Sequence, residues 1–284
     1  MILVTGAGGT VGGELVNRLS SEGVPFRAAY RSAAGVAAAR SRGIDAIGVE
    51  YDRPESLRPA LQGVDSMFLL CANGPDQTRY EINAVREAVN GGVKRIVKLS
   101  VWDAGGQEFS FARTHRAVER EIESSGLVWT FLRPNGFMQN LSNFHAAGVK
   151  AGVIHLCGTR TPISHIDARD VAAVAAAVLA TGSDHSAMAY DLTGPEALTY
   201  QQIAMSLSKA LGREIVCEET SPADFRKAMI RSGSPDWVAD AVIDLMRYYL
   251  DGRAGRVTPW VGRITGREPG SFDRFVRDYR GAFA

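Results

Sequence analysis

Apolar and polar residues change their spacing repeatedly along the first half of the chain. An apolar run over residues 1–4 leads into glycines, after which Leu15, Val16 and Leu19 recur at helical spacing. This predicts a strand, a tight turn and a helix. Five more strands are expected over 24–31, 44–49, 66–71, 95–100 and 127–132, with helices over 33–42, from 54, over 76–89 and over 111–124. Six strands alternating with helices predict right-handed crossovers and an α/β, doubly wound parallel sheet.

Beyond Arg133 and Pro134 the pattern is different. Strand signals are confined to residues 153–156, 187–192 and 214–217, and helical periodicity dominates, notably over 170–179 and 200–211. We therefore expect a dinucleotide-binding domain over 1–133. Residues 134–284 are expected to form mainly a smaller, largely helical C-terminal substrate lobe, some segments of which return to the sheet.

The turn after the first strand carries glycines at every third position, Gly6, Gly9 and Gly12. In a dinucleotide site the first permits the tight turn, the second lets the backbone approach a phosphate, and the third lets the helix pack closely. The N–H groups around Thr10 and Val11 then face an anion at the positive end of the helix dipole. The alternative is a structural glycine turn without a ligand.

The end of the second strand decides between NAD and NADP, because a carboxylate there binds the ribose hydroxyls and repels a 2′-phosphate. Here Arg31 and Ser32 follow Tyr30 and no carboxylate is present. An arginine forks onto phosphate, so NADP(H) is predicted as the cofactor, unless Arg31 is only a surface residue. Other expected cofactor contacts, at the ends of later strands, are Glu50, Tyr51, Cys71, Ala72, Asn73, Ser100 and Val101.

Composition narrows the class of protein. The chain of 284 residues is 45% hydrophobic and 22% charged with a formal net charge of +1, which gives no reason to expect a nucleic-acid partner. Residues 247–280 contain eight arginines, but acidic residues are interspersed among them. The three cysteines are far apart, so neither a disulfide framework nor a metal site is expected. With no membrane span or signal segment apparent, a cytoplasmic protein is predicted.

Several segments together resemble the NmrA-like, atypical branch of the short-chain dehydrogenase/reductase superfamily. The matching segments are residues 5–12, 30–31, 54–57, 125–134, 166–172 and 190–195. The resemblance covers nearly the whole chain and implies a Rossmann domain, a small C-terminal substrate lobe and NADP as ligand. Members of the family include quinone and triphenylmethane-dye reductases, the isoflavone-reductase group and non-catalytic redox-sensing regulators.

One departure from the superfamily concerns the catalytic Tyr-x-x-x-Lys, which is absent. His115, on the fifth predicted helix, stands where the isoflavone-reductase group carries a lysine and quinone-reductase-like members carry histidine. A histidine titrates near neutrality and can protonate a developing oxyanion, so His115 is the candidate catalytic residue. A helix histidine without chemistry is the alternative. Ser100 is a weaker candidate for orienting the substrate.

Hydride transfer needs few side chains, because the cofactor carries the chemistry and the protein supplies position and a dry pocket. Residues after Arg133 are expected beside the nicotinamide, namely Pro134, Asn135, Gly136 and Phe137. An apolar wall for a flat substrate is expected from Trp102, Phe137, Met138, Phe144 and Trp237, each of which has the core as its alternative place.

Three functions stay open at this point. The first is an NADPH-dependent reductase of a quinone or related conjugated aromatic compound, whose partner is that small molecule. The second is a non-catalytic NADP(H) sensor that binds a protein partner. The third is a tailoring ketoreductase or enoyl reductase of a biosynthetic pathway. A homodimer is the default for a soluble enzyme.

Overall fold

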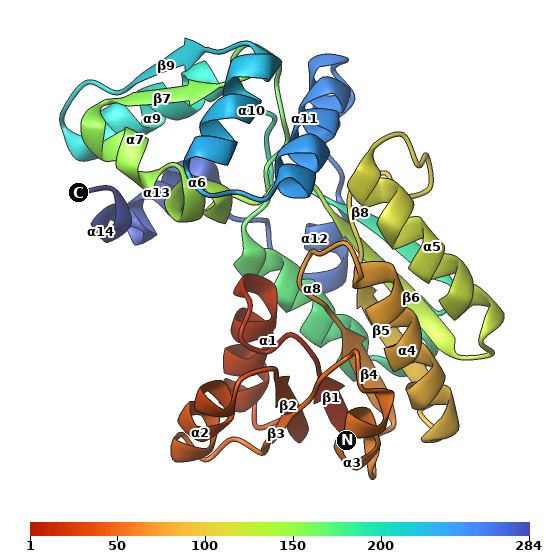
Figure 1. Cartoon of the computed structure of the whole chain (residues 1–284). Helices are drawn as coiled ribbons and strands as arrows, with labels where there is room; N and C mark the ends of the chain where they lie inside the picture. Colours follow the sequence, from red (N-terminus) through yellow and green to blue (C-terminus); the bar gives the residue numbers. More distant parts are fainter.

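The computed structural model describes the side chains of residues 1–181 and 184–284. At its centre is a parallel sheet of seven strands in the order β3-β2-β1-β4-β5-β6-β8 (Figure 1). The doubly wound α/β fold expected from the sequence is confirmed, with one strand more than the six predicted for the first half. The strands are β1 (Ile2–Val4), β2 (Phe26–Tyr30), β3 (Ala46–Gly48), β4 (Ser66–Leu69), β5 (Arg95–Leu99), β6 (Val128–Pro134) and β8 (Met188–Leu192).

The inner strands send alternate side chains into two separate cores, as a sheet covered on both faces requires. Ile2 and Val4 of β1 face one core, whereas Leu3 faces the other. The first core is closed by α1 (Thr10–Ser21), α2 (Ala33–Ser41), α8 (Ala168–Ala180) and α12 (Trp260–Thr265). The second is closed by α3 (Leu57–Leu61), α4 (Gln77–Asn90) and α5 (Ser110–Ser124). The carboxyl ends of all these parallel strands meet at one edge.

Parts of the second half of the chain complete this domain. Helix α8 packs along α1, β8 pairs with β6, and α12 packs on α8 and β8. The sheet domain therefore contains segments far beyond residue 133, as Figure 1 shows by the green and blue elements beside the red and orange ones. The predicted boundary at residue 133 therefore marks the point where the chain first leaves the sheet, and later segments return to the sheet domain.

The smaller lobe is built around a third core, which β7 (Val153–Leu156) and β9 (Val216–Glu219) cover as a separate two-stranded parallel sheet. Its helices are α6 (Gln139–Phe144), α7 (Ala146–Ala151), α9 (Tyr200–Leu211), α10 (Pro222–Arg231), α11 (Asp236–Leu250), α13 (Phe272–Asp278) and α14 (Arg280–Phe283). Among the side chains described, no helix is long and apolar enough to cross a bilayer.

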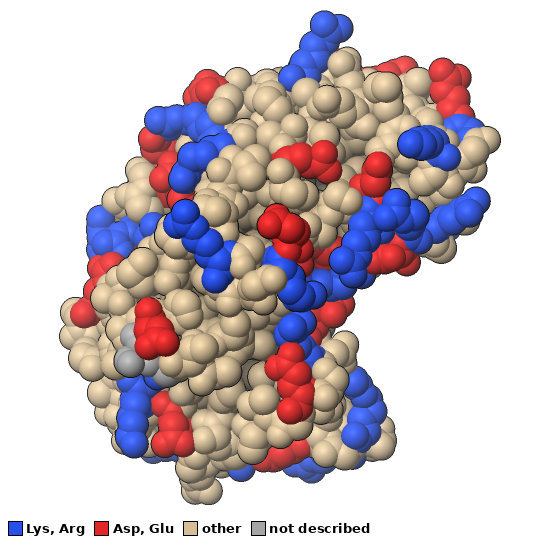
Figure 2. Space-filling view, turned by 180° about the vertical axis from the view of Figure 1, so that it is seen from behind, with Lys and Arg blue, Asp and Glu red and all other residues tan. Residues whose placement is uncertain are grey.

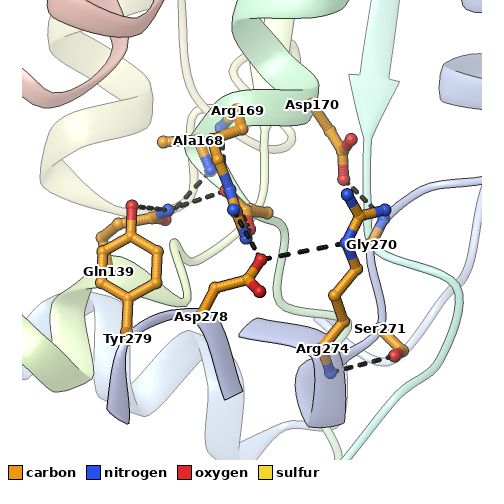
Figure 3. A network of polar contacts seen from close by, with 10 residues as sticks. Gln139, Ala168, Arg169, Asp170, Gly270, Ser271, Arg274, Asp278 and Tyr279 are labelled. Atoms are coloured by element: carbon orange, nitrogen blue, oxygen red, sulfur yellow. Dashed lines mark hydrogen bonds and ion pairs between the residues drawn. The ribbon is translucent and has the colours of Figure 1, made fainter. Parts of the chain in front are cut away.

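A polar junction ties the lobe to the sheet domain (Figure 3). The buried Gln139 amide donates to Asp167 Oδ1 at 2.8 Å and accepts the Ala168 N–H at 2.9 Å. Asp167 caps α8, and Arg169 pairs with both Asp167 and Asp278 of α13. The start of α8 is thereby held between α6 and the C-terminal helices.

Beside this junction, the back of the molecule carries a notch where basic and acidic side chains alternate (Figure 2). It is a groove of about 590 Å³ between α1, the start of α8 and residues 267–274. Several of its arginines are already paired, Arg18 with Glu22 and Arg169 with Asp167.

Candidate active site

The glycine turn between β1 and α1 has the geometry that a pyrophosphate cradle needs. Gly6 has φ +62°, and a Cβ there would lie 2.7 Å from Leu70 Cγ. A Cβ on Gly12 would lie 2.1 Å from the Gly6 carbonyl oxygen, so α1 can approach the turn only because residue 12 is glycine. Gly9 precedes the helix as its N-cap. The residues present therefore fit a bound dinucleotide, with the backbone of residues 6–12 as its floor.

Hydrogen-bond donors at this turn are available to a ligand. The first N–H groups of a helix, here those of Thr10 and Val11, have no acceptor within the helix. The N-cap residue is Gly9, which has no side chain that could accept from them. These donors and the helix dipole favour an anion at this point.

The residues expected to choose the cofactor lie just after β2. Arg31 is exposed, and within the described part of the chain it has no ion-pair partner. Its charge lowers the thiol pKa of Cys71 after β4, although burial dominates and raises that pKa to about 12. Ser32 caps α2 by accepting the Gly35 N–H at 3.1 Å. The Arg31 guanidinium is thus free to meet a phosphate at the carboxyl edge.

Two residues expected to contact the cofactor have other partners. The Tyr51 hydroxyl donates to the Leu70 carbonyl at 3.0 Å, and its ring packs on the second core. Glu50 forms an exposed ion pair with Arg53 at 3.3 Å. Tyr51 thus supports the sheet edge, while Ala72 and Asn73 lie exposed there and Glu50 keeps an accessible carboxylate.

Ser100, directly after β5, belongs to a buried ion-pair network. Its hydroxyl donates to Glu119 Oε1 at 2.7 Å, and Arg133 of β6 binds the same carboxylate through Nε at 2.9 Å and Nη2 at 2.7 Å. Burial opposes ionisation of Glu119, but hydrogen bonds from Arg133 and Ser100 bring its pKa below the ordinary value. This network fixes the end of β5 against β6 and α5, beside Val101.

His115 lies one turn before Glu119 on α5 and is 7% exposed. Its Nδ1 is 3.1 Å from Lys98 Nζ, and its Nε2 is 3.4 Å from Gln77 Nε2. Lys98 pairs in turn with Glu81 at 2.7 Å, and both of these side chains are fully buried. We call Gln77, Glu81, Lys98 and His115 the Lys98 cluster.

Burial and the nearby charge of Lys98 both lower the pKa of His115 well below the usual value. The ring is therefore neutral near pH 7. The expectation of a protonated imidazolium that titrates near neutrality was wrong for this environment. A neutral imidazole can act as a hydrogen-bond donor instead.

Residues 134–138 turn from β6 toward the lobe. Pro134 and Asn135 are buried, and the Asn135 amide donates to Ser164 Oγ and to the Ala254 carbonyl, both at 2.9 Å. Gly136 is partly exposed, with His165 packed against it so closely that a Cβ would lie 3.2 Å from its Cδ2. Phe137 is also partly exposed, so these two residues present the accessible surface of the segment.

The proposed apolar wall divides into different environments. Trp102 and Met138 are each 2% exposed and belong to the lobe core, where the Trp102 indole donates to the Arg253 carbonyl. Because both side chains are enclosed, they do not form an open wall for a substrate. Phe144 is 75% exposed at the end of α6, and Trp237 is partly exposed on α11.

Sequence reasoning missed the charged residues that hold His115 and Ser100. Lys98 stands among the apolar residues Ile96, Val97 and Leu99 of β5, and Glu81 and Glu119 stand on the inner faces of their helices. A lysine inside an otherwise apolar buried strand requires a partner, and that was the available signal. Among the described side chains, no group of three or more His, Cys, Asp or Glu residues is arranged to hold a metal ion.

Comparison with known proteins agrees with this geometry. The chain is 33% identical over 284 residues to an NAD(P)H azoreductase of Xenophilus azovorans, covering 100% of this chain and 99% of the relative. It is 36% identical over 288 residues to the (4-alkanoyl-5-oxo-2,5-dihydrofuran-3-yl)methyl phosphate reductase of Streptomyces griseus, with 100% and 99% coverage. The NADPH complex of an Escherichia coli quinone oxidoreductase superposes with a TM-score of 0.90 at 27% identity, over 99% of this chain and 100% of that one.

The family model described as NAD(P)H-binding matches residues 6–182, which include the glycine turn, the carboxyl edge and the Lys98 cluster. The resemblance stated from the sequence is thereby confirmed. The chain belongs to this NAD(P)H-binding family, within the NmrA-like atypical short-chain dehydrogenases/reductases, and is an NAD(P)H-dependent oxidoreductase.

Proposed function

We propose that this protein is an NADPH-dependent reductase of a quinone or a related conjugated, electron-poor compound. The observation that carries the proposal is the arrangement of the carboxyl edge. The glycine turn and the unpaired Arg31 lie at one end of it, and the neutral donor His115 lies near the ends of β4 and β5. A quinone, an azo compound and an unsaturated lactone, acceptors named or implied by the related proteins, all take up a hydride in a conjugated system.

The bound cofactor supplies the hydride. The backbone of residues 6–12 would hold its pyrophosphate, and Arg31 would meet the 2′-phosphate. Ala72, Asn73 and the buried Ser100 network form the edge beside the nicotinamide end. Gly136 and Phe137 close that end from the lobe side.

His115 acts on the acceptor as a neutral hydrogen-bond donor. Reduction of a carbonyl-type acceptor places negative charge on an oxygen, and a donor aimed at that oxygen stabilises the transition state. Water protonates the reduced oxygen after the product has left the site. An acceptor that gains no oxyanion, such as a cationic dye, needs no such donor.

A second candidate is a reductase of a conjugated lactone in a biosynthetic pathway. It is favoured by the 36% identity to the dihydrofuranyl methyl phosphate reductase over the full chain. The same hydride chemistry serves both candidates, and the acceptor distinguishes them.

The test is NADPH oxidation with a panel of quinones, azo dyes, a cationic triphenylmethane dye and unsaturated lactones. We expect turnover, with kcat for the best quinone lowered roughly 10²–10³-fold in His115→Ala, as for loss of an oxyanion donor. Turnover of the cationic dye should change little. Tight NADPH binding without turnover of any acceptor would contradict the proposal and favour the sensor.

A further inference from the structure

Lys98 has three hydrogen-bond partners for the three protons of its ammonium group. They are Glu81 Oε2 at 2.7 Å, the Leu99 carbonyl oxygen at 3.0 Å and His115 Nδ1 at 3.1 Å. A lysine ammonium donates and cannot accept. Nδ1 of His115 must therefore be the acceptor, and in a neutral ring the proton is then on Nε2.

The contact with Gln77 places a condition on this assignment. Gln77 Nε2 lies 3.4 Å from His115 Nε2, which pairs two donors if the ring proton is on Nε2. An amide can present its oxygen by turning over, whereas the lysine has no such choice. The assignment therefore requires the Gln77 amide oxygen, rather than its nitrogen, to face Nε2 of His115. At 3.4 Å this contact is also longer than the 3.1 Å contact with Lys98, so it holds the ring more weakly.

From these contacts we propose that Lys98, anchored by Glu81, is a positioning residue that fixes His115 in the Nε2–H tautomer and aims that N–H at the substrate oxygen. The tautomer follows from the cluster alone. The use of the N–H toward substrate rests on the proposed reductase function.

Every element packed around His115 contributes to this state. Helix α4 supplies Gln77 and Glu81, and β5 supplies Lys98. On α5 the next carboxylate, Glu119, is engaged by Arg133, Arg116 and Ser100 and makes no hydrogen bond to the ring. The positive charge of Lys98 also disfavours a second proton on the ring, in the same direction as burial.

Imidazole ¹⁵N NMR of the whole protein measures the tautomer directly. His115 signals are assigned by their loss in His115→Gln. We expect the Nε2–H pattern in the wild type, without titration between about pH 8 and pH 5.5. In the double variant Lys98→Met/Glu81→Gln, which removes both buried charges together, the ring should show the other tautomer or titrate near its ordinary pKa. An Nδ1–H ring in the wild type overturns the proposal even where the double variant does not fold.

Kinetics then test the use of the N–H. In the double variant, kcat for the best quinone should fall at least about tenfold, with NADPH affinity and turnover of a cationic dye nearly unchanged. Lys94→Met is the matched control, because the Lys94 side chain is 80% exposed just before β5. An unchanged tautomer and unchanged kcat in the folded double variant would refute the positioning role. If the wild type reduces no acceptor, the proposed function fails while the NMR result still decides the tautomer.

Discussion

The two ends of the cofactor site are built in opposite ways. At the phosphate end the protein offers backbone N–H groups and an exposed arginine, all from residues 6–31. At the end where reduction is proposed, it offers Lys98, Glu81 and His115, three buried side chains from a strand and two helices. Shape governs the first end, because the absence of side chains creates the cradle. Charge pairing governs the second, because each buried group depends on its neighbours.

The comparison shows why the two ends tolerate change differently. A glycine cradle fails when an atom is added, since the backbone behind it cannot move away. A buried polar cluster fails when a partner is removed, because the remaining groups lose their hydrogen bonds in a place that water does not reach. Three predictions test this contrast, from the largest expected effect to the smallest.

The first adds one methyl group to the cradle. In Gly12→Ala the new Cβ would lie 2.1 Å from the Gly6 carbonyl oxygen, so α1 must shift. We expect the unfolding free energy to fall by about 3 kcal/mol or more, with a large loss of NADPH affinity, by denaturant titration and calorimetry. Gly13→Ala is the control on the same helix, since its Cβ would have an ordinary 3.7 Å contact with the Ala7 carbonyl oxygen. Equal behaviour of the two variants would show that close packing is not what residue 12 provides.

The second prediction removes the exposed charge at the phosphate end. Arg31→Ala should weaken NADPH binding about ten- to a hundredfold while NADH affinity stays nearly constant, because only NADPH has a 2′-phosphate. Calorimetry with both nucleotides measures this. Arg42→Ala, at the far end of α2, should leave both affinities unchanged. A wild type that prefers NADH would remove the basis for assigning Arg31 this role.

The third prediction concerns acid sensitivity of the buried region. Burial lowers the pKa of His165, packed against Gly136, to about 4. The unfolded state takes up a proton near pH 6.5 and the folded state does not, so stability must fall as pH falls below that value. Between pH 7 and 5 this histidine should account for about 2 kcal/mol of lost stability.

Denaturant unfolding at the two pH values measures that slope. The loss of stability between pH 7 and pH 5 should be smaller in His165→Gln than in the wild type, by about 2 kcal/mol. An identical pH dependence in the wild type and His165→Gln would mean that the ring is protonated in the folded protein.

Much of the sheet could be predicted because its signals are local. The strand over 66–69 is visible in the sequence as a short apolar run, and the structure has it; the same holds for helix 200–211 of the smaller lobe, whose periodicity lies within a dozen residues. The glycine turn is likewise contained in residues 6–12. The pairing of β8 with β6 was not foreseen as part of this sheet beyond the expectation that some segments return, because nothing in residues 188–192 names a partner strand.

The environments of individual side chains were harder to predict from the sequence than the strands of the sheet. In the sequence, Trp102 and Met138 look like residues that could line an open pocket for an aromatic ligand. In the structure the core of the lobe encloses both side chains. Likewise, the pKa of His115 is lowered by burial and by Lys98, which is seventeen positions earlier in the sequence and one hydrogen bond away in space. The burial and the pKa of a side chain depend on which helices and strands become neighbours in the fold. The periodicity of apolar residues along the sequence does not indicate these neighbours.

The late position of β8 also affects how the protein is made. During synthesis, residues 1–134 emerge with β6 as a bare edge strand, and the strand that covers it begins only at Met188. The helix that completes the α1 face, α8, arrives in the same interval. A nascent chain therefore displays an unpaired strand and an uncovered apolar surface until about residue 192 has been translated, which is the state in which edge-to-edge association and chaperone binding occur. Slow translation between β6 and β8 should lengthen that exposure and lower the yield of folded protein.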